Sequence, residues 1–290
     1  MCIRDSTDAG AHVSAFNTTQ GRRNRFQINF RNHLKIVVVD GKVAWIGGHN
    51  VGDEYLGRDP DFGHWRDTHA RLMGPAVLGA QLSFLEDWNW ATREKLVVDW
   101  LPDPAADASR TALVIPTGPA DTRETASLMF VQAISAATER LWIASPYFVP
   151  DEAVLKALEL ADLRGVDVRI LIPDKPDHLL VYLAAYIYIE MFDHTDIGFY
   201  RYTKGFLHQK VVLVDDQIAV VSTANLDNRS LRLNFEVSLL AVDEPFAAEV
   251  ARMLEEDFSN SRQMEPGEFA AKPYWFRLGA RVARLTSPIL

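Results

Sequence analysis

The chain has 290 residues, and its 48% hydrophobic content supplies enough apolar material for one or two buried cores. Its formal net charge of −9 argues against broad electrostatic binding to nucleic acid, and its single cysteine, Cys2, excludes an internal disulfide and a cysteine-based metal site. The longest apolar run, at positions 179–189, falls short of the ~18–20 residues that cross a bilayer.

In chain order, the apolar pattern first predicts a short strand at residues 12–16. Two longer strands follow at residues 34–39 and 43–46, and Asp40-Gly41 between them is typical of a two-residue hairpin turn. Residues 76–90 have the apolar spacing of a helix. We expect this first part of the chain to end in a linker at residues 96–122, which is rich in Pro, Ala and Asp.

The rest of the chain alternates predicted strands and helices. The strands are expected at residues 112–115, 141–144, 166–172, 197–200, 211–214 and 218–221, and the helices at residues 127–138, 152–163, 179–192 and 246–258. This alternation indicates α/β layers with mixed sheets. Two interpretations of residues 275–290 stay open: a packing helix, or an amphipathic segment that lies on an anionic membrane.

One pattern occurs twice, once in each half of the chain, and reads H-x-K-x-x-x-x-D with an apolar interior. In both copies an Asn follows the His at the same offset. The matched positions are His33, Lys35, Asp40 and Asn50 in the first copy, and His208, Lys210, Asp215 and Asn225 in the second. A single copy would be weak evidence, but the repeat predicts a duplicated catalytic half-site.

The geometry of a strand places His33 and Lys35 on the same face, since side chains alternate with period two. After the hairpin turn, the return strand is expected to bring Asn50 close to them. The second copy repeats this arrangement with Asn225 beside His208 and Lys210. Asp40 and Asp215 have the opposite parity and lie at the far end of the strand, so we interpret them as structural turn or ion-pair residues.

Two His, two Lys and two Asn form a set suited to a phosphodiester. Lysine charges and amide donors bind phosphate oxygens, one imidazole attacks phosphorus, and a second, protonated imidazole gives a proton to the leaving group. Fixed lysine charge stabilises the transition state without a metal. Each imidazole needs an acceptor that fixes its tautomer, and we expect Glu236 to orient His208 and Asp67 to orient His33.

These motifs resemble the phospholipase D superfamily, and the surrounding sequence is closest to the bacterial cardiolipin synthases. The resemblance is carried by HLKIVVVDG (33–41), GDEYLG (52–57), WRDTH (65–69), SPYFVP (145–150), GFLHQK (205–210) and NFE (234–236). It implies two α/β domains related by a pseudo-twofold, with both His at their interface and no metal or other cofactor. It also implies transfer of a phosphatidyl group between two phosphatidylglycerol molecules, with release of glycerol, through a phosphohistidine on His33 and acid–base catalysis by His208.

The resemblance further predicts how the chain is organised. Residues 1–105 would be the C-terminal part of a first, incomplete domain, and residues 106–290 a complete second domain. Family members have membrane-spanning helices upstream, so we expect those to be missing and the catalytic part to be peripheral to the bacterial inner membrane. The expected partners are anionic phospholipid and a membrane surface, with no nucleic acid. Two alternatives stay open: a hydrolase of the same superfamily, and an inactive lipid-binding fragment.

Overall fold

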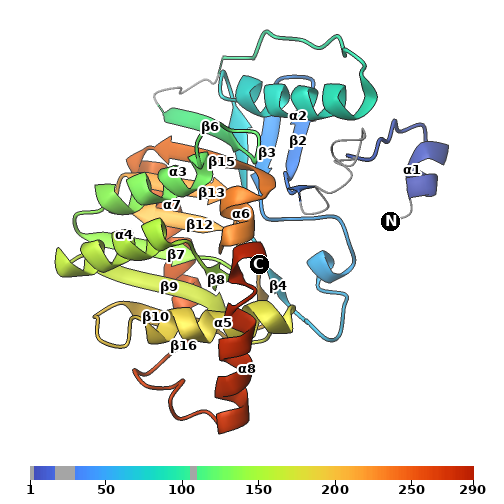
Figure 1. Ribbon diagram of the computed structural model, residues 1–290. Helices are drawn as coiled ribbons and strands as arrows, with labels where there is room; N and C mark the ends of the chain where they lie inside the picture. The colour runs from blue at the N-terminus through green and yellow to red at the C-terminus, as the bar shows by residue number, and fades with distance from the viewer. Residues whose placement is uncertain (1–2, 17–29, 105–109) are drawn as a thin grey trace.

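A nine-stranded mixed sheet organises the second half of the chain in the computed structural model, which describes residues 3–16, 30–104 and 110–290 (Figure 1). The strands lie in the order β1 (Arg31–Asn32), β15 (Asn234–Val242), β13 (Ile218–Ser222), β12 (Val211–Val214), β7 (Arg140–Ala144), β9 (Asp167–Pro173), β10 (Gly198–Tyr202) and β16 (Ser261–Gln263), and β6 (Thr111–Thr117) also pairs with β15. The predicted mixed α/β fold is confirmed.

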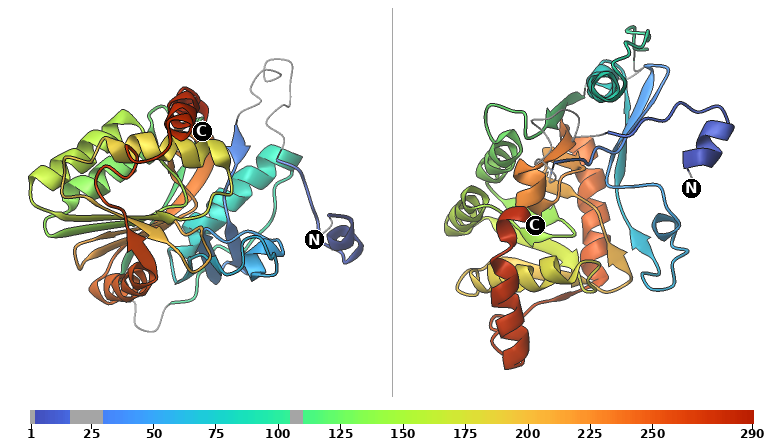
Figure 2. Two further views of the ribbon diagram at one scale, coloured as in Figure 1. Left: turned by 90° about the horizontal axis from the view of Figure 1, so that it is seen from below. Right: turned by 45° about the vertical axis from the view of Figure 1, so that its right-hand side comes forward.

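Helices cover both faces of this sheet (Figure 2). One face carries α3 (Thr125–Ala136), α4 (Glu152–Leu163) and α5 (Leu179–Glu190), and the other carries α7 (Glu244–Ser259). Because strand side chains alternate, Ile143 joins the core under the first group of helices, whereas its neighbour Trp142 joins the core under α7. Each face of the sheet therefore has its own buried apolar layer.

The first half of the chain forms a smaller copy of part of this arrangement. Strands β2 (Ile36–Val39), β3 (Val43–Gly47) and β5 (His69–Met73) make a three-stranded antiparallel sheet, against which α2 (Val77–Thr92) packs. Ile46 and Leu72 belong to the same buried cluster as Leu213 and Leu239 of the large sheet. The two halves thus share a core on the α7 side, and the proposed boundary near residue 105 stays a prediction.

Two short parallel pairs tie the halves together. In one, β1 of the first half joins β15 of the second, with Asn32 opposite Phe235. In the other, β11 (Phe206–Leu207) of the second half joins β4 (Trp65–Arg66) of the first, with Leu207 opposite Arg66. In each half, the strand that precedes the motif histidine therefore pairs with a strand of the opposite half.

The remaining elements are short or peripheral: α1 (Ile3–Asp8), η1 (Glu54–Leu56), β8 (Phe148–Val149), β14 (Leu226–Asp227), α6 (Asn228–Arg232), α8 (Tyr274–Arg284) and η2 (Ser287–Ile289). Strands β8 and β14 pair in parallel beside the large sheet, and α8 packs against α5. Within the described ranges, no helix is long and apolar enough to span a membrane.

Most of the predicted elements are confirmed within a few residues, and the helix at 152–163 is confirmed at both ends. That helix starts cleanly because the Asp151 side chain accepts a hydrogen bond from Val154 N at 2.9 Å. The strand predicted at residues 12–16 is wrong, since these residues have no regular structure and no strand of the described chain pairs with them. Part of the predicted linker, residues 105–109, lies outside the described residues.

Candidate active site

The two motif histidines each meet a carboxylate from the opposite half. His33 Nδ1 lies 2.9 Å from both oxygens of Glu236, and His208 Nδ1 lies 2.8 Å from Asp67 Oδ2. The predicted pairing of Glu236 with His208 and of Asp67 with His33 is therefore wrong. The site is crossed, and both halves are needed to complete either histidine–carboxylate pair.

The crossing follows from the two parallel strand pairs. After Asn32 pairs with Phe235, the next residues in register are His33 and Glu236, and the His33 amide donates to Phe235 O at 2.9 Å. The second pair behaves in the same way. The His208 amide donates to Arg66 O at 2.8 Å, which places His208 beside Asp67.

The carboxylates fix the tautomer of both imidazoles. Burial favours the protonated acid of Glu236, but the charge of His33 and its hydrogen bond outweigh burial and hold the pKa of Glu236 below its usual value. For Asp67, the hydrogen bond from His208 and the charge of Lys210 likewise outweigh burial and lower its pKa. An ionised carboxylate only accepts, so Nδ1 of each ring carries the proton and Nε2 is left for chemistry.

Glu236 is completely buried and accepts hydrogen bonds from three side chains. Besides His33, its oxygens accept from Thr223 Oγ1 at 2.6 Å and from Asn234 Nδ2 at 3.0 Å. The residue that corresponds to Thr223 in the first copy of the repeat is Gly48, where an added Cβ would lie 2.2 Å from Asp67 Oδ1. Gly48 therefore leaves room for the Asp67 carboxylate, whereas Thr223 fills the equivalent space beside Glu236 with a hydroxyl donor.

A polar network braces the residues next to the His208–Asp67 pair. Arg66 makes a two-pronged ion pair with Asp257 of α7, with both N–O distances at 2.7 Å. Gln209 Nε2 donates to the same carboxylate at 2.7 Å, and Thr68 Oγ1 donates to Gln209 Oε1 at 2.7 Å. Residues on both sides of Asp67 and the residue after His208 are thereby held to α7, so the pair has little freedom to shift.

Both motif lysines are buried beside the histidines. Lys35 Nζ donates to His33 O at 2.8 Å, and Lys210 Nζ lies 3.1 Å from each ring nitrogen of His208. Burial lowers the pKa of Lys35 to about 8 and that of Lys210 to about 7, against the opposing charges of Glu236 and Asp67. Burial and the charge of Lys210 lower the pKa of His208 to about 3, so this ring is neutral in the empty site.

Each motif asparagine donates a hydrogen bond to a neighbouring side chain, and its predicted place beside the His and Lys of its own copy stays a prediction. Asn50 Nδ2 donates to Tyr55 OH at 2.7 Å, and the Tyr55 ring lies 6.0 Å from the His208 ring. Asn225 Nδ2 donates to Asp227 Oδ2 at 3.2 Å. Its Oδ1 is buried and has no partner within the described chain, so it remains able to accept a hydrogen bond. Their contact with substrate stays a prediction.

The motif aspartates are structural, as their parity predicts. Asp215 accepts hydrogen bonds from the backbone amides of Thr138, Glu139 and Arg140, and from the Thr138 hydroxyl. Asp40 and Asp215 both occupy the left-handed backbone region in their hairpin turns, with φ of 52° and 50°. Asp fits this position better than most residues do. Their role is to close the turns, away from the imidazoles.

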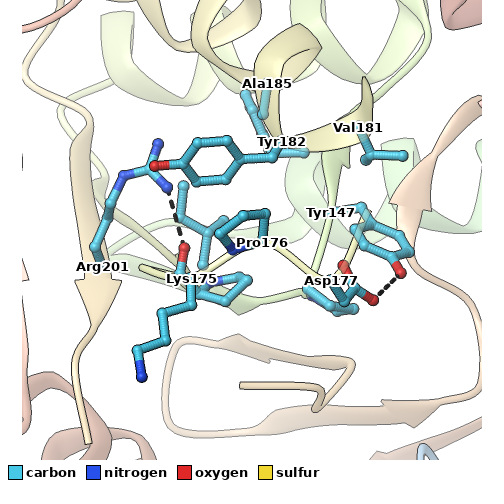
Figure 3. Close-up of a pocket in the computed structure, with 12 residues that line it drawn as sticks. Tyr147, Lys175, Pro176, Asp177, Val181, Tyr182, Ala185 and Arg201 are labelled. Atoms are coloured by element: carbon cyan, nitrogen blue, oxygen red, sulfur yellow. Dashed lines mark hydrogen bonds between the residues drawn. The ribbon is translucent and has the colours of Figure 1, made fainter. Parts of the chain in front are cut away.

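Aromatic side chains surround His208, and sequence reasoning assigned them no role. The rings of Trp65 and Phe206 lie 5.1 and 6.2 Å from the His208 ring. A separate small hollow lies where Tyr147 and Asp177 point toward each other and form a hydrogen bond (Figure 3). In the sequence, Tyr147 was marked only by its place in the SPYFVP stretch that carries part of the family resemblance.

Side chains capable of chemistry converge here from both halves. They are two imidazoles that each meet a carboxylate through Nδ1, two buried lysines, and the Asn225 amide oxygen, which has no partner among the described residues. In the part of the chain that the structure describes, no three His, Cys, Asp or Glu side chains gather where they could hold a metal ion. The arrangement suits nucleophilic and acid–base chemistry on an anionic group.

Comparison with known proteins places this site in a family. Residues 130–258, which include β11, β12 and the second motif, match the family model described as "Cardiolipin synthase, PLD-like domain". This segment is a phospholipase D-like domain. The predicted resemblance to the phospholipase D superfamily and to cardiolipin synthases is confirmed.

The relatives extend the similarity over nearly the whole chain. The chain is 56% identical over 288 residues to cardiolipin synthase A of Pseudomonas fluorescens and 54% identical over 283 residues to that of Pseudomonas syringae. These alignments cover 99% and 98% of this chain but only 60% and 59% of the relatives. Among solved structures, phosphatidylserine synthase of Haemophilus influenzae has a similar fold, with a TM-score of 0.70 at 15% identity over 96% of this chain and 74% of that one.

Proposed function

We propose that the chain carries the catalytic site of a phosphatidyltransferase that makes cardiolipin from two phosphatidylglycerol molecules. The observation that carries the proposal is the crossed site, in which two imidazoles are oriented by carboxylates of opposite halves and flanked by two buried lysines. The similarity to cardiolipin synthases over 99% of the chain supports the choice of a lipid phosphodiester as substrate.

The first step of the proposed mechanism forms a covalent intermediate. His33 Nε2 attacks the phosphorus of phosphatidylglycerol while Glu236 stabilises the positive charge that develops on the ring. The bond from phosphorus to the glycerol oxygen breaks, and protonated His208 gives its proton to that oxygen, so glycerol leaves. Lys35 and Lys210 stabilise the negative charge on the phosphate oxygens.

The second step returns the enzyme to its starting state. Neutral His208 accepts the proton of a headgroup hydroxyl on a second phosphatidylglycerol as that oxygen attacks phosphorus. The bond from phosphorus to His33 Nε2 breaks, and cardiolipin is released. The low pKa of His208 keeps the ring neutral, so it is available to accept a proton in this step. Its role as acid in the first step requires the bound phosphate charge to raise that pKa.

The proposed setting is a membrane surface. Both substrate molecules are anionic phospholipids anchored in a bilayer, so the site must work at the lipid–water boundary. We place this catalytic part at the periphery of the bacterial inner membrane.

Incubation with phosphatidylglycerol vesicles, followed by lipid analysis, tests the proposal. We expect cardiolipin and glycerol, and after an acid-free quench a phosphorylated histidine that disappears in His33→Ala. Phosphatidic acid without cardiolipin would instead identify a hydrolase, in which water replaces the lipid hydroxyl. Absence of both products and of the phosphohistidine would support a lipid-binding role without turnover.

A further inference from the structure

Helix α8 has two apolar stripes, and only one of them is buried. On the buried side, Ala280 and Ala283 are almost fully covered, and the Phe276 ring lies 5.1 Å from the ring of Tyr186 in α5. This stripe is enough to hold the helix to the rest of the fold. The other stripe is largely exposed.

The second stripe faces away from the molecule. Trp275, Leu278, Val282 and Leu285 are exposed by 73%, 50%, 56% and 80%. Their spacing of three, four and three positions places them along one side of a helix that is about 16 Å long. A continuous row of large exposed apolar side chains on one element differs from the single exposed residues that are normal on a surface.

The charge around this stripe is opposite to that of the chain as a whole. Residues 269–290 contain Lys272, Arg277, Arg281 and Arg284 but no Asp or Glu, whereas the whole chain has a formal net charge of −9. Lys272 forms an ion pair with Glu268 at 3.3 Å, so the positive charge beside the stripe comes from the three arginines. Arg281 is exposed, and the Arg284 guanidinium lies over the Tyr188 ring at 5.6 Å. Apolar side chains flanked by arginines are the composition of helices that lie flat in the headgroup region of an anionic bilayer.

The position of α8 connects this surface to the candidate active site. Helix α8 crosses α5, and the end of the chain lies beside α6 (Figure 1). There the Arg229 amide donates to Leu290 O at 2.7 Å. Helix α6 directly follows Asp227, the hydrogen-bond partner of Asn225. The helix is therefore joined by short, packed segments to the part of the site that would receive substrate.

We propose that α8 is a membrane-docking helix whose exposed stripe of Trp275, Leu278, Val282 and Leu285 inserts into the headgroup region of an anionic bilayer. The inference deepens the proposed function and rests on it for the choice of a lipid surface as the occupant. A second copy of the chain is disfavoured because a helix-to-helix contact would bring the same arginines together. Docking here holds the site at the surface where both lipid substrates lie.

Vesicle flotation tests this surface without any need for turnover. The variant is Trp275→Glu/Val282→Glu, and the matched control is Leu160→Glu/Leu163→Glu on α4, whose leucines are similarly exposed at 52% and 80%. Vesicles contain phosphatidylserine in phosphatidylcholine, so that binding of phosphatidylglycerol at the active site does not contribute. We expect the α8 variant to lose binding on the order of tenfold while the α4 variant binds as the unmodified chain does.

Two further measurements complete the test. Arg281→Gln is expected to reduce the preference for anionic over pure phosphatidylcholine vesicles, and all variants should melt at the same temperature because the positions are exposed. Unchanged flotation of the α8 variant, or equal loss in the α4 control, overturns the proposal. A shift from dimer to monomer in the α8 variant with unchanged flotation would also overturn it. Turnover on phosphatidylglycerol in detergent micelles is measured separately, so that failure of the proposed activity and failure of the docking surface give different results.

Discussion

Replacement of Glu236 by Gln separates the crossed site from an uncrossed one. The Glu236 carboxylate is fully buried and accepts from His33 Nδ1, Thr223 Oγ1 and Asn234 Nδ2. Glutamine has the same shape but only one accepting oxygen. That oxygen can accept from His33 and Asn234. The Thr223 hydroxyl can then donate to Val237 O, which lies 3.3 Å away, and accept a hydrogen bond from the new amide group. The fold should therefore survive the change.

The expected magnitude follows from the loss of charge. Hydrogen bonds to an ionised group contribute ~1.5–3 kcal/mol and neutral ones ~0.5–1.5 kcal/mol, so the His33 tautomer should lose about 1–2 kcal/mol of preference. That is about 5–30-fold in the ratio of Nδ1–H to Nε2–H imidazole. A comparable loss is expected in the free energy of unfolding and in turnover, because only the Nδ1–H tautomer leaves Nε2 free to attack phosphorus.

Nuclear magnetic resonance of the imidazole nitrogens provides the assay, with Asp67→Asn as the matched variant. We expect Glu236→Gln to change the nitrogen shifts of His33 and leave those of His208 close to the original. Asp67→Asn should do the reverse. If Glu236→Gln instead altered His208 and spared His33, each carboxylate would act within its own half and the crossed geometry would be refuted.

Three further outcomes are expected. Gly48→Ala adds a Cβ 2.2 Å from Asp67 Oδ1, so it should displace Asp67 and reduce turnover, whereas Thr223→Ser at the equivalent position should be nearly neutral in the same lipid assay. Asp215→Asn keeps the left-handed turn but weakens several hydrogen bonds, so urea unfolding should show a loss of about 1–2 kcal/mol with unchanged turnover per folded molecule. For His208, the folded pKa of about 3 lies below the usual value of 6.5, so the unfolded chain binds the extra proton and stability rises with pH between these values. Between pH 7 and pH 5 the free energy of unfolding should therefore fall by about 2 kcal/mol more in the unmodified chain than in His208→Gln. An equal pH dependence of unfolding in the two chains would contradict a neutral, buried ring.

Sequence reasoning predicted the local parts of this molecule well. The two hairpins, the turns at Asp40 and Asp215, and the long helices follow from periodicity and turn chemistry, which depend on neighbours in the sequence. The residues of the candidate site were also found, because the repeat marks them. Both carboxylates were named, and the structure places each of them against an imidazole.

The partner of each carboxylate could not be read from the sequence. Glu236 follows His208 in the second half of the chain and Asp67 follows His33 in the first, so proximity along the chain favoured the wrong pairs. The true pairs depend on β1 joining β15 and β11 joining β4, and in each case only two positions are in register. Such short strands leave no periodic signal. The Arg66–Asp257–Gln209 network was missed for the same reason, since its members are far apart in the chain.

The crossed pairing has a consequence for how the site is assembled. Neither half can hold its own histidine in the working tautomer, because the necessary acceptor lies in the other half. The buried lysines add to this dependence. With pKa values of about 8 and 7 they are costly to bury, and the charge that most offsets this cost comes from the opposite half: Glu236 for Lys35 and Asp67 for Lys210. Docking therefore completes tautomer selection and charge compensation together. A change that separates β4 from β11 should release His208 from Asp67 and leave Lys210 without that opposing charge, while the His33–Glu236 pair depends on β1 and β15. An unchanged titration of His208 after such a change would contradict this dependence on the opposite half.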